Sequence, residues 1–582
     1  MQKIKVAIHN RAYNSWEFTQ DDVKVDIPNL IPSKHKLLHN DIIHFKPAKN
    51  SIRTADLYSS WFVTNNDLNS STKGADLNLH WFKDETIVIV ESPFRDIILP
   101  GVLILGKTYG RSGKRLLYKC IPDNKSLPVF LVPYTIDATF SKVVKNKYIV
   151  FRFVDWLNDH PHGEIKDTLG DVDSLEAFNE YQLYRRGLHL SLTPFVKASR
   201  VILRDKDPVQ NILDKTNYCI EDLRSIKNIF TIDPADCTDF DDAFSTSEEN
   251  GVATINVYIA NVFIWLETYG LWEHMTDRVS TIYLPDKKRP MLPPLLSDDL
   301  CSLKQGADRF TFMMSVKYDM QTLAQIGEPV FKNAVINIQK NYTYEDKKLE
   351  KNLGYKILRT LAKTEDSHDV VAFWMIRMNV LAAEHLQSKG KGIFRISDGE
   401  NILEKPMFKG GGISRQALSK ASPLGELVLP ALYSEVCAPH SQLGVDAYVH
   451  ITSPIRRLVD ILNQILFQSG VSESCKTFLD KWTHQLDLVN SATKDIRKTQ
   501  MDCELLALVD KNGSSQELSG IIFDRNFVSG KYEYAVYIEE LKMFSRIKLE
   551  ECIENFTKSR FRIFVFDDED RLCRKIQLQK IY

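Results

Sequence analysis

The spacing of apolar residues changes twice along this chain, and these changes constrain its fold more than any other feature. Short runs that alternate with period two, such as "KIKVAIHN" and "VKVDIPNL", fill the first part and are broken by Asn, Pro and Asp. This pattern is typical of strands in small antiparallel barrels. We expect one barrel over residues 1–85 and a second barrel, with a linker, over residues 86–200. The expected strands of the second barrel are "GVLILGKTY", "LLYKCI", "PVFLVPY" and "YIVFRFVDW".

The middle of the chain has a helical period. Apolar residues recur at spacings of three and four in "GYKILRTLAK", in "DVVAFWMIRMNVLAAEHL" and in a long stretch that starts at Lys476. Strand-like runs around a group of aspartates precede them, so we predict an α+β domain over residues 201–510. Period-two runs return in "EYAVYIEE", "FSRIKLEE" and "FRIFVFDD", which predicts a third barrel over residues 515–582. The chain should therefore be a multidomain protein in which β-barrels flank a central α+β domain.

Composition limits the classes of function. With 582 residues, of which 43% are hydrophobic, the chain can bury several cores. The formal net charge of −1 means that attraction to a polyanion would have to come from local grooves. Nine cysteines are scattered without a CxxC pair, which is typical of reduced thiols, and we expect a reducing compartment, cytoplasmic or nuclear. The longest apolar run, "IILPGVLIL", is too short to cross a bilayer, and we expect no signal peptide and no membrane role.

A basic segment, "GKTYGRSGKR", lies between two expected strands of the second barrel. It places Lys107, Arg111, Lys114 and Arg115 around three glycines and Tyr109. The segment does not meet the P-loop consensus. Two interpretations stay open: a basic hairpin that touches a sugar-phosphate backbone, and a solvated turn.

Four aspartates crowd into "TIDPADCTDFDDAFS": Asp233, Asp239, Asp241 and Asp242. Strand-like runs bracket this stretch, so we expect the carboxylates at a strand end, in a tight connection and at the start of the next strand, and therefore close together. Two like charges ~4 Å apart repel by about 1 kcal/mol in water and by more when partly buried, and a divalent cation removes that cost. Oxygen ligands suit Mg²⁺ or Mn²⁺, and two ions could support phosphodiester hydrolysis. A solvated acidic loop is the alternative.

The segment "TSPIRR" supplies cations. Ser453 and Pro454 form a good N-cap and first-turn pair, so we predict that a helix begins there with Arg456 and Arg457 in its first turn. Cations at that end oppose the helix dipole, which is easier to understand if a phosphate docks there. Salt bridges from the two arginines to nearby carboxylates are the alternative.

At these residues the chain resembles the ribonuclease II / ribonuclease R family, especially its eukaryotic exosome branch. The family signatures TIDPxxxxDxDDA and HFTSPIRR stand here as "TIDPADCTDFDDA" and "HITSPIRR", and "YLPDKKRPMLPPLLSDDLCSL" follows the family pattern between them. The resemblance implies OB-fold, cold-shock-like barrels around a catalytic RNB domain, and an S1-like barrel at the C-terminal end. It also implies a processive, Mg²⁺-dependent 3′-to-5′ exoribonuclease that releases nucleoside 5′-monophosphates from single-stranded RNA.

The resemblance also implies roles for individual residues. Asp233, Asp239 and Asp242 would bind or orient magnesium together with Asp241, and loss of Asp241 would stop cleavage while RNA still binds. Arg456 would stabilise the transition state. Two tyrosines would stack on bases near the 3′ end, and we add Arg457 as an RNA contact; these RNA-binding residues are Tyr283, Tyr344 and Arg457. For each tyrosine a plain core role stays open.

Three departures from the family pattern leave competing hypotheses. Tyr258 and Asn261 stand where His and Asp are usual, and Ala372 and Phe373 stand where two glutamates are usual. The second hypothesis is therefore an RNA-binding protein that has lost turnover, and the third is a metal-dependent deoxyribonuclease. We expect no PIN domain, and therefore neither endonuclease activity nor PIN-mediated docking on an exosome ring. Separately, we expect a monomer.

Overall fold

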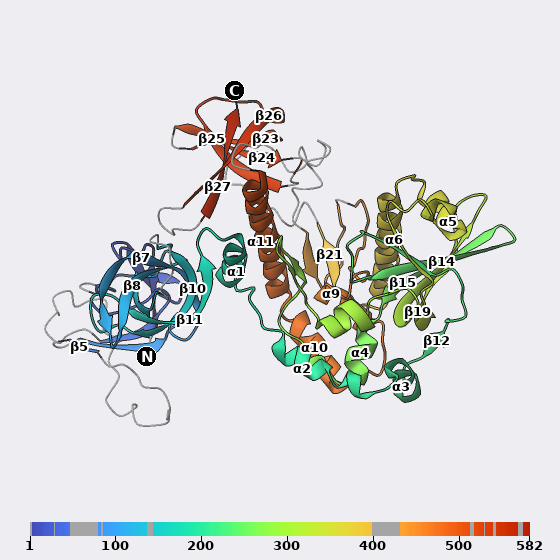
Figure 1. The fold of residues 1–582 in the computed structure, drawn as a ribbon, viewed down its shortest axis with the longest axis horizontal. Coiled ribbons are helices and arrows are strands. Elements are labelled where there is room, and N and C mark those ends of the chain that lie inside the picture. Colours follow the sequence, from blue (N-terminus) through green and yellow to red (C-terminus); the bar gives the residue numbers. More distant parts are fainter. Residues whose placement is uncertain are drawn as a thin grey trace. The chain divides into compact units, whose positions relative to one another are not determined.

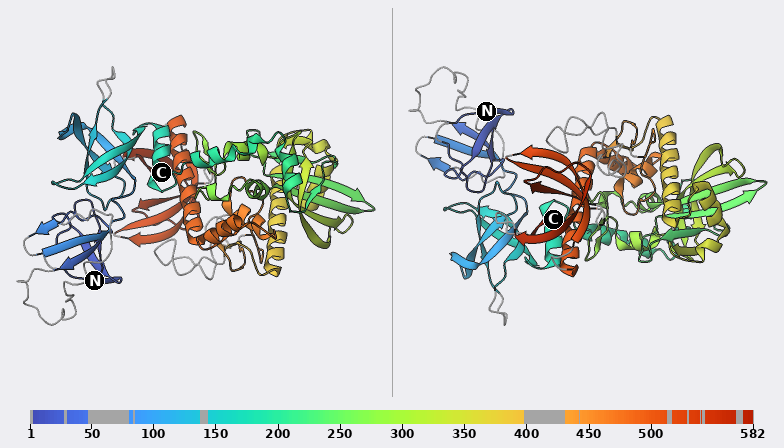
Figure 2. Two further views of the ribbon diagram at one scale, coloured as in Figure 1. Left: turned by 90° about the horizontal axis from the view of Figure 1, so that it is seen from below. Right: turned by 90° about the horizontal axis from the view of Figure 1, so that it is seen from above.

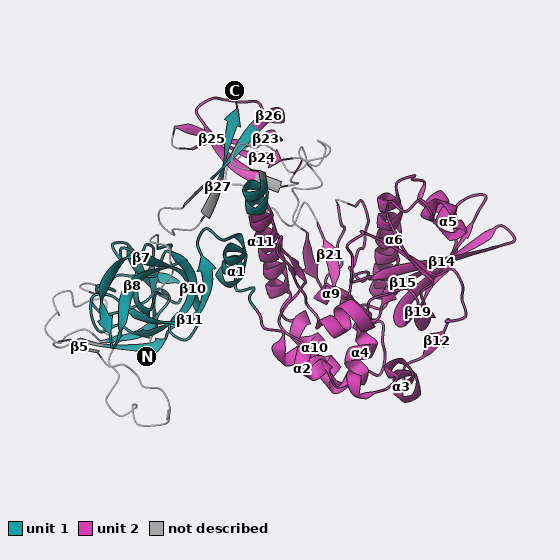
Figure 3. Cartoon of the chain, viewed as in Figure 1, with its two compact units in different colours: residues 1–189, 505–517, 561–582 teal, residues 190–504, 518–560 magenta. Residues whose placement is uncertain are grey.

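The computed structural model describes residues 3–27, 30–46, 80–82, 85–136, 144–397, 431–441, 443–512, 517–528, 530–538, 540, 543–567 and 574–581. The chain forms two compact units (Figure 3). The first comprises Met1–His189, Leu505–Glu517 and Phe561–Tyr582, and the second comprises Leu190–Glu504 and Leu518–Arg560.

The first unit contains two β-structures in chain order (Figure 1). A six-stranded sheet has the order β3-β2-β1-β4-β6-β5. Its strands are β1 (Ile4–Ile8), β2 (Trp16–Gln20), β3 (Val23–Val25), β4 (Ile42–Lys46), β5 (His80–Phe82) and β6 (Glu85–Glu91). Because β6 runs to Glu91, the predicted division at residue 85 falls at the start of its last strand.

A closed barrel with the order β10-β11-β9-β8-β7 follows. Its strands are β7 (Leu99–Ser112), β8 (Arg115–Pro122), β9 (Phe130–Tyr134), β10 (Lys147–Asp155) and β11 (His162–Asp171), and α1 (Leu175–Arg185) comes after them. A Cβ atom on Gly101 would lie 2.7 Å from Cys120 Sγ and 2.9 Å from the Ile121 carbonyl, so the barrel wall closes only around glycine there. The predicted strands of this barrel are confirmed.

The core of the second unit is a seven-stranded sheet with the order β12-β19-β18-β15-β14-β13-β20. Its strands are β12 (Ile220–Asp222), β13 (Phe230–Asp233), β14 (Asp242–Glu249), β15 (Val252–Ala260), β18 (Asp308–Asp319), β19 (Gln325–Asn337) and β20 (Lys340–Thr343). The helices α4 (Val262–Thr268), α5 (Leu353–Ala362) and α6 (Ser367–Ser388) come from the same region. In both views of Figure 2, α6 lies beside this sheet.

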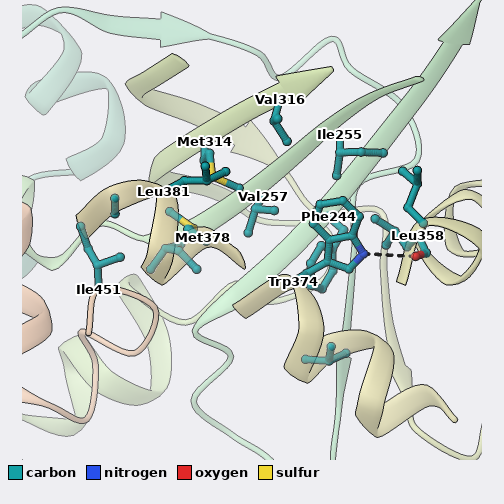
Figure 4. Close-up of a cluster of buried hydrophobic side chains, with 14 of the residues drawn as sticks. Phe244, Ile255, Val257, Met314, Val316, Leu358, Trp374, Met378, Leu381 and Ile451 are labelled. Atoms are coloured by element: carbon teal, nitrogen blue, oxygen red, sulfur yellow. Dashed lines mark hydrogen bonds between the residues drawn. The ribbon is translucent and has the colours of Figure 1, made fainter. Parts of the chain in front are cut away.

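Trp374 on α6 is the centre of the packing between helix and sheet. Its side chain is fully buried among residues such as Phe244 and Ile255, and its indole N–H donates to the Leu358 carbonyl at 3.3 Å (Figure 4). The ring also meets Tyr318 edge to face, with centroids 5.8 Å apart. The helical period predicted for this region is thus confirmed by α5 and α6, whose apolar faces cover the sheet.

Between residues 193 and 512, the other described elements are mostly helical. They include α2 (Thr193–Ser199), α3 (Pro208–Lys215), β16 (Ile282–Tyr283), β17 (Lys288–Arg289), β21 (Phe394–Ile396), β22 (Leu432–Ser434), α9 (Leu458–Leu466), α10 (Glu473–Thr483) and α11 (Leu486–Asn512). The long helical stretch predicted from Lys476 is divided between α10 and α11. No helix in the described residues is long and apolar enough to cross a membrane.

The C-terminal region consists of strands, as predicted. They are β23 (Glu517–Val528), β24 (Lys531–Ile538), β25 (Met543–Leu549), β26 (Thr557–Asp567) and β27 (Arg574–Ile581). In the second unit, β24 pairs antiparallel with both β23 and β25.

Candidate active site

The four aspartates lie where β13 gives way to β14. β13 is buried along its whole length, so its last residue, Asp233, lies in the protein interior. Pro234 follows and has no N–H to donate to a strand partner, which ends the strand. The connecting loop is held at Phe240, whose N–H donates to the Ser302 hydroxyl at 3.1 Å. Asp242 then begins β14, so the predicted placement of carboxylates at a strand end and a strand start is confirmed.

Asp241 and Arg456 form an ion pair between the two signature segments. Arg456 Nε lies 3.0 Å from Asp241 Oδ2, and the Ile455 N–H donates to Asp241 Oδ1 at 3.0 Å across 214 positions of sequence. The Asp241 side chain is 3% exposed, whereas that of Arg456 is 47% exposed. The guanidinium therefore covers the carboxylate with one edge and keeps another edge open to solvent.

The segment "TSPIRR" forms a turn, so the predicted helix start at Ser453 is wrong. The N–H groups of Arg456 and Arg457 both donate to the Ser453 carbonyl, at 3.2 and 3.0 Å. Arg457 is extended, with φ −137° and ψ 129°, because it forms a bridge with Ser280, and α9 begins only at Leu458. The dipole argument therefore does not apply to Arg456, whose position is set by Asp241.

Asp233 and Asp242 are buried carboxylates with oxygens that have no donor. In each, Oδ2 is inaccessible to solvent and lacks a hydrogen-bond partner among the described residues. Burial raises the pKa of Asp233 to about 6, and burial together with the charges of Asp233 and Asp241 raises the pKa of Asp242 well above its usual value. Burial also raises the pKa of Asp241 to about 7, although Arg456 acts in the opposite direction. At these carboxylates the effect of burial therefore outweighs that of the neighbouring positive charge.

The four carboxylates differ in what neutralises them. Asp241 is paired with Arg456, and Asp239 lies 3.3 Å from Lys288 Nζ. In the described parts of the chain, no three or more His, Cys, Asp or Glu side chains are grouped closely enough to enclose a metal ion. Mg²⁺ and Mn²⁺ prefer oxygen ligands. Asp233 and Asp242 fit such a cation, because one buried oxygen of each carboxylate accepts no hydrogen bond from the described residues.

Tyr283 faces the acidic loop from β16. Its hydroxyl donates to Asp239 Oδ2 at 3.1 Å, and its side chain is half-exposed. Burial and the Asp239 charge raise the pKa of Tyr283, so the phenol stays protonated and remains a donor. Lys288, on β17, also contacts Asp298 at 2.8 Å. The sequence by itself did not indicate this role for Lys288, which lies five positions after Tyr283.

Tyr344 lies beside the strand that carries Asp233. Its N–H donates to the Asp233 carbonyl at 3.2 Å, and its ring stacks on His368 with centroids 3.7 Å apart and planes 16° apart. Burial raises the pKa of Tyr344 to about 12. His368 could not be identified from the sequence, because no residue near it indicates contact with Tyr344, which lies 24 positions earlier.

Arg457 has a buried acidic partner. Its Nη2 donates to Asp460 Oδ1 at 3.0 Å, and the fully buried Asp460 also accepts the Ser453 N–H at 2.6 Å. This is the salt-bridged alternative that the sequence left open. Arg457 thereby fastens the turn that presents Arg456, and its proposed RNA contact remains a prediction.

Two of the residues that depart from the family pattern, Tyr258 and Asn261, make hydrogen bonds within the protein. Tyr258 is buried on β15 and shares a hydrogen bond of 2.9 Å with the Ser245 hydroxyl on β14. Asn261 caps α4 by accepting the Ile264 N–H at 3.1 Å. Both residues therefore have structural partners on elements next to the aspartates.

Ala372 and Phe373 lie on the exposed side of α6. Phe373 is 36% exposed and meets Trp374 edge to face. Neither side chain can accept a hydrogen bond, so these two positions offer no carboxylate to a ribose hydroxyl.

The family model described as "RNB domain" matches residues 220–349 and 346–473, which contain the acidic loop and the arginine turn. The chain contains an RNB domain. The human "Exosome complex exonuclease RRP44" is 31% identical over 250 residues, which is 42% of this chain and 25% of that protein. "Ribonuclease R" of Chlamydia muridarum is 26% identical over 321 residues, 42% of this chain and 46% of that protein. The chain spans between a quarter and about half of the length of these curated relatives.

Solved structures show the fold around the RNB domain. Mycoplasma genitalium RNase R in complex with ribose-methylated single-stranded RNA matches with a TM-score of 0.62 and 18% identity, over 100% of this chain and 96% of that chain. Yeast Ssd1, described as a pseudonuclease, matches with a TM-score of 0.56 and 14% identity, over 94% of this chain and 79% of that chain. The fold is that of OB-fold barrels flanking an α+β RNB domain, as predicted.

Proposed function

We propose that this protein is a 3′-to-5′ exoribonuclease that hydrolyses single-stranded RNA to nucleoside 5′-monophosphates. The observation that carries the proposal is the ion pair between Asp241 and Arg456. It brings two distant signature segments together beside Asp233 and Asp242, each of which has one buried oxygen without a hydrogen-bond donor among the described residues. Burying carboxylates is energetically costly, and clusters of buried, perturbed carboxylates are typical of functional sites, so this arrangement favours an enzymatic role over a solvated acidic loop.

The site has the parts that phosphodiester hydrolysis requires. A water oxygen attacks phosphorus, the bond to the 3′ oxygen of the preceding nucleotide breaks, and that oxygen leaves with a proton as a 3′-hydroxyl. Asp233 and Asp242 would hold a divalent cation, which supplies charge neutralisation and activates water when bound. The open edge of Arg456 would donate to the phosphoryl oxygens as negative charge develops.

The aromatic residues suit a substrate without sequence preference. Tyr283 is held by Asp239 and Tyr344 is held by His368, so both rings have defined orientations near the acidic loop. Stacking of a base on such a ring contributes about 1–3 kcal/mol and does not depend on the base. A processive enzyme needs binding of this kind.

A second candidate is an RNA-binding protein of the same fold without turnover. Ala372 and Phe373 favour it, because neither side chain can accept a hydrogen bond at the two positions where the family usually has glutamates. The likeness to a pseudonuclease is compatible with it but concerns the fold alone.

One assay separates the two candidates. Single-stranded RNA labelled along its whole length is incubated with the protein and Mg²⁺, with parallel reactions containing EDTA, DNA of the same sequence or the Asp241→Asn variant. We expect mononucleotides from RNA with Mg²⁺ alone, and RNA binding without cleavage by Asp241→Asn. Tight RNA binding by the wild type without any mononucleotide would support the second candidate. Equal cleavage of DNA would instead indicate a nuclease that does not read the 2′-hydroxyl.

A further inference from the structure

Asp239 has a hydrogen-bond donor on each of its two side-chain oxygens. Lys288 Nζ lies 3.3 Å from Oδ1, and the Tyr283 hydroxyl donates to Oδ2 at 3.1 Å. The Thr238 hydroxyl is a further donor to Oδ1, at 3.4 Å. The Asp239 side chain is only 11% exposed, so water has little access to these oxygens. The protein itself therefore neutralises this carboxylate.

Two of these donors come from one small hairpin. β16 and β17 pair antiparallel with Tyr283 directly opposite Lys288, so neighbouring side chains reach the two oxygens of one carboxylate. Lys288 Nζ also contacts Asp298 at 2.8 Å and donates to the Thr238 hydroxyl at 2.7 Å. All three N–H bonds of the ammonium group thus have acceptors, which hold the charge in one place.

The main chain on both sides of Asp239 is fixed as well. The fully buried Ser302 hydroxyl donates to the Thr238 carbonyl at 2.9 Å and accepts the Phe240 N–H at 3.1 Å. The Leu303 N–H donates to the Phe240 carbonyl at 3.0 Å. These contacts keep the Asp239 side chain next to the hairpin.

Asp233 and Asp242 are in the opposite situation. One buried oxygen of each accepts no hydrogen bond from the described residues. Mg²⁺ usually keeps several waters and is held by one or two carboxylates plus substrate phosphates, so these two carboxylates are sufficient for one ion. A second ion would lie about 4 Å from the first. At Asp239 it would have to bind beside the Lys288 ammonium group, which repels it.

The charges of the acidic loop balance without a second ion. Arg456 and Lys288 contact two of its four aspartates, and one divalent cation supplies the charge for the other two. Asp298 shares Lys288, but its side chain is 32% exposed, so water also solvates it.

We infer that this protein binds one divalent cation, at Asp233 and Asp242, and that the ammonium group of Lys288 takes the place of a second cation beside Asp239. The inference rests on the proposed function for the role of the cation, and it differs from the two-ion site that the four aspartates allowed from the sequence. Lys288 is a positioning residue, because it acts through Asp239 and has no N–H bond left for a substrate.

The test counts the Mn²⁺ ions that the full chain binds without RNA, by isothermal titration calorimetry and by the EPR signal of free Mn²⁺. Lys288→Met removes the ammonium group but keeps an unbranched side chain, and Lys288→Arg keeps the charge. The double variant Asp239→Asn, Lys288→Met removes both members of the pair. The control is Lys332→Met, which takes an exposed lysine from Glu221 in the same unit.

We expect one Mn²⁺ per chain for the wild type, for Lys288→Arg and for the control. Lys288→Met should bind about two, because the Asp239 carboxylate is then free of its cation. The double variant should bind one, with a Kd within about threefold of the wild type, because it loses no ligand of the first ion and no net charge. Asp242→Asn, by contrast, should weaken Mn²⁺ binding by at least about tenfold.

Two Mn²⁺ ions per wild-type chain, or none, would overturn the inference. A double variant that loses Mn²⁺ binding as severely as Asp242→Asn would also overturn it, since Asp239 would then be a ligand of the first ion. One ion in Lys288→Met, folded by circular dichroism, would show that Lys288 does not stand in for a cation. If Lys288→Met does not fold, the wild type and the double variant decide.

The count is independent of hydrolysis. A wild type that binds one Mn²⁺ but releases no mononucleotides from RNA would remove the proposed function and leave this inference standing. A wild type that hydrolyses RNA and binds two ions would do the reverse.

Discussion

Replacement of Arg456 by alanine should reduce turnover far more than RNA affinity. In the structure, one edge of the guanidinium is used by Asp241 at 3.0 Å and by the Ser453 hydroxyl at 3.2 Å, and the rest is open. The open edge matters most when charge develops on the phosphoryl group, since an interaction that strengthens in the transition state affects kcat. Loss of one such donor lowers kcat by about 100- to 1,000-fold, or about 2.7–4 kcal/mol.

The effect on RNA binding should be smaller. One phosphate contact at 0.1 M salt is worth about fivefold in affinity. The variant also leaves buried Asp241 without its cation, and because Arg456 is half-exposed we expect this to lower the free energy of unfolding by only about 1–2 kcal/mol.

The measurement combines single-turnover cleavage of labelled RNA with Kd values measured in EDTA. A matched control is Arg224→Ala, which removes a guanidinium paired with Asp222 and Asp308 in the same unit. The control should keep both kcat and Kd within about threefold of the wild type. If Arg456→Ala weakens binding by the same factor as turnover, the arginine contributes ground-state binding alone and the assigned role is wrong.

Two further predictions concern stability. In urea denaturation, Trp374→Ala should lower the free energy of unfolding by about 3–5 kcal/mol, because the side chain is fully buried. The control Phe373→Ala removes a half-exposed ring and should lower it by less than about 1.5 kcal/mol. Equal losses of stability would contradict the packing described for α6. His450 is half-buried, shares a hydrogen bond of 2.8 Å with the Tyr433 hydroxyl, and has a pKa well below its usual value because of desolvation and the charges of Arg457 and Arg395. Below about pH 6.5 the unfolded chain binds a proton at His450 that the folded chain does not bind, so acidification favours unfolding of the wild type. The free energy of unfolding of the wild type, relative to that of His450→Gln, should therefore fall by up to about 1.4 kcal/mol for each pH unit below 6.5. If the stability difference between the two proteins is constant between pH 7.5 and 5, His450 takes up a proton equally in the folded and the unfolded chain, and the low pKa is wrong.

Local patterns in the sequence were sufficient for most elements. The alternation in "YIVFRFVDW" predicted β10, and the three-and-four spacing in "GYKILRTLAK" predicted α5, because each pattern reflects which side of a single element meets a core. The placement of Asp233 and Asp242 at a strand end and a strand start followed in the same way. The resemblance of the signature motifs then indicated the RNB domain that the family model confirms.

Other features depend on partners far away in the chain. Ser453 and Pro454 have the residue types of a helix start, but the bridge between Arg457 and Ser280 keeps the backbone extended and delays α9 to Leu458. Local propensity lost there to a strand-like contact that no neighbouring residue encodes. The sequence also left open whether the two arginines meet phosphate or carboxylate, and the structure pairs Arg457 with the buried Asp460.

The sequence by itself determined which side chains can do chemistry here: four aspartates on one loop and two adjacent arginines more than two hundred positions later. Only the tertiary structure decided how they divide the work, since it buries Asp241 against Arg456, gives Asp239 to Lys288, and leaves oxygens of Asp233 and Asp242 without donors. The physical reason is that composition and spacing fix the charges of a segment, whereas burial and distance between segments fix which charges neutralise each other.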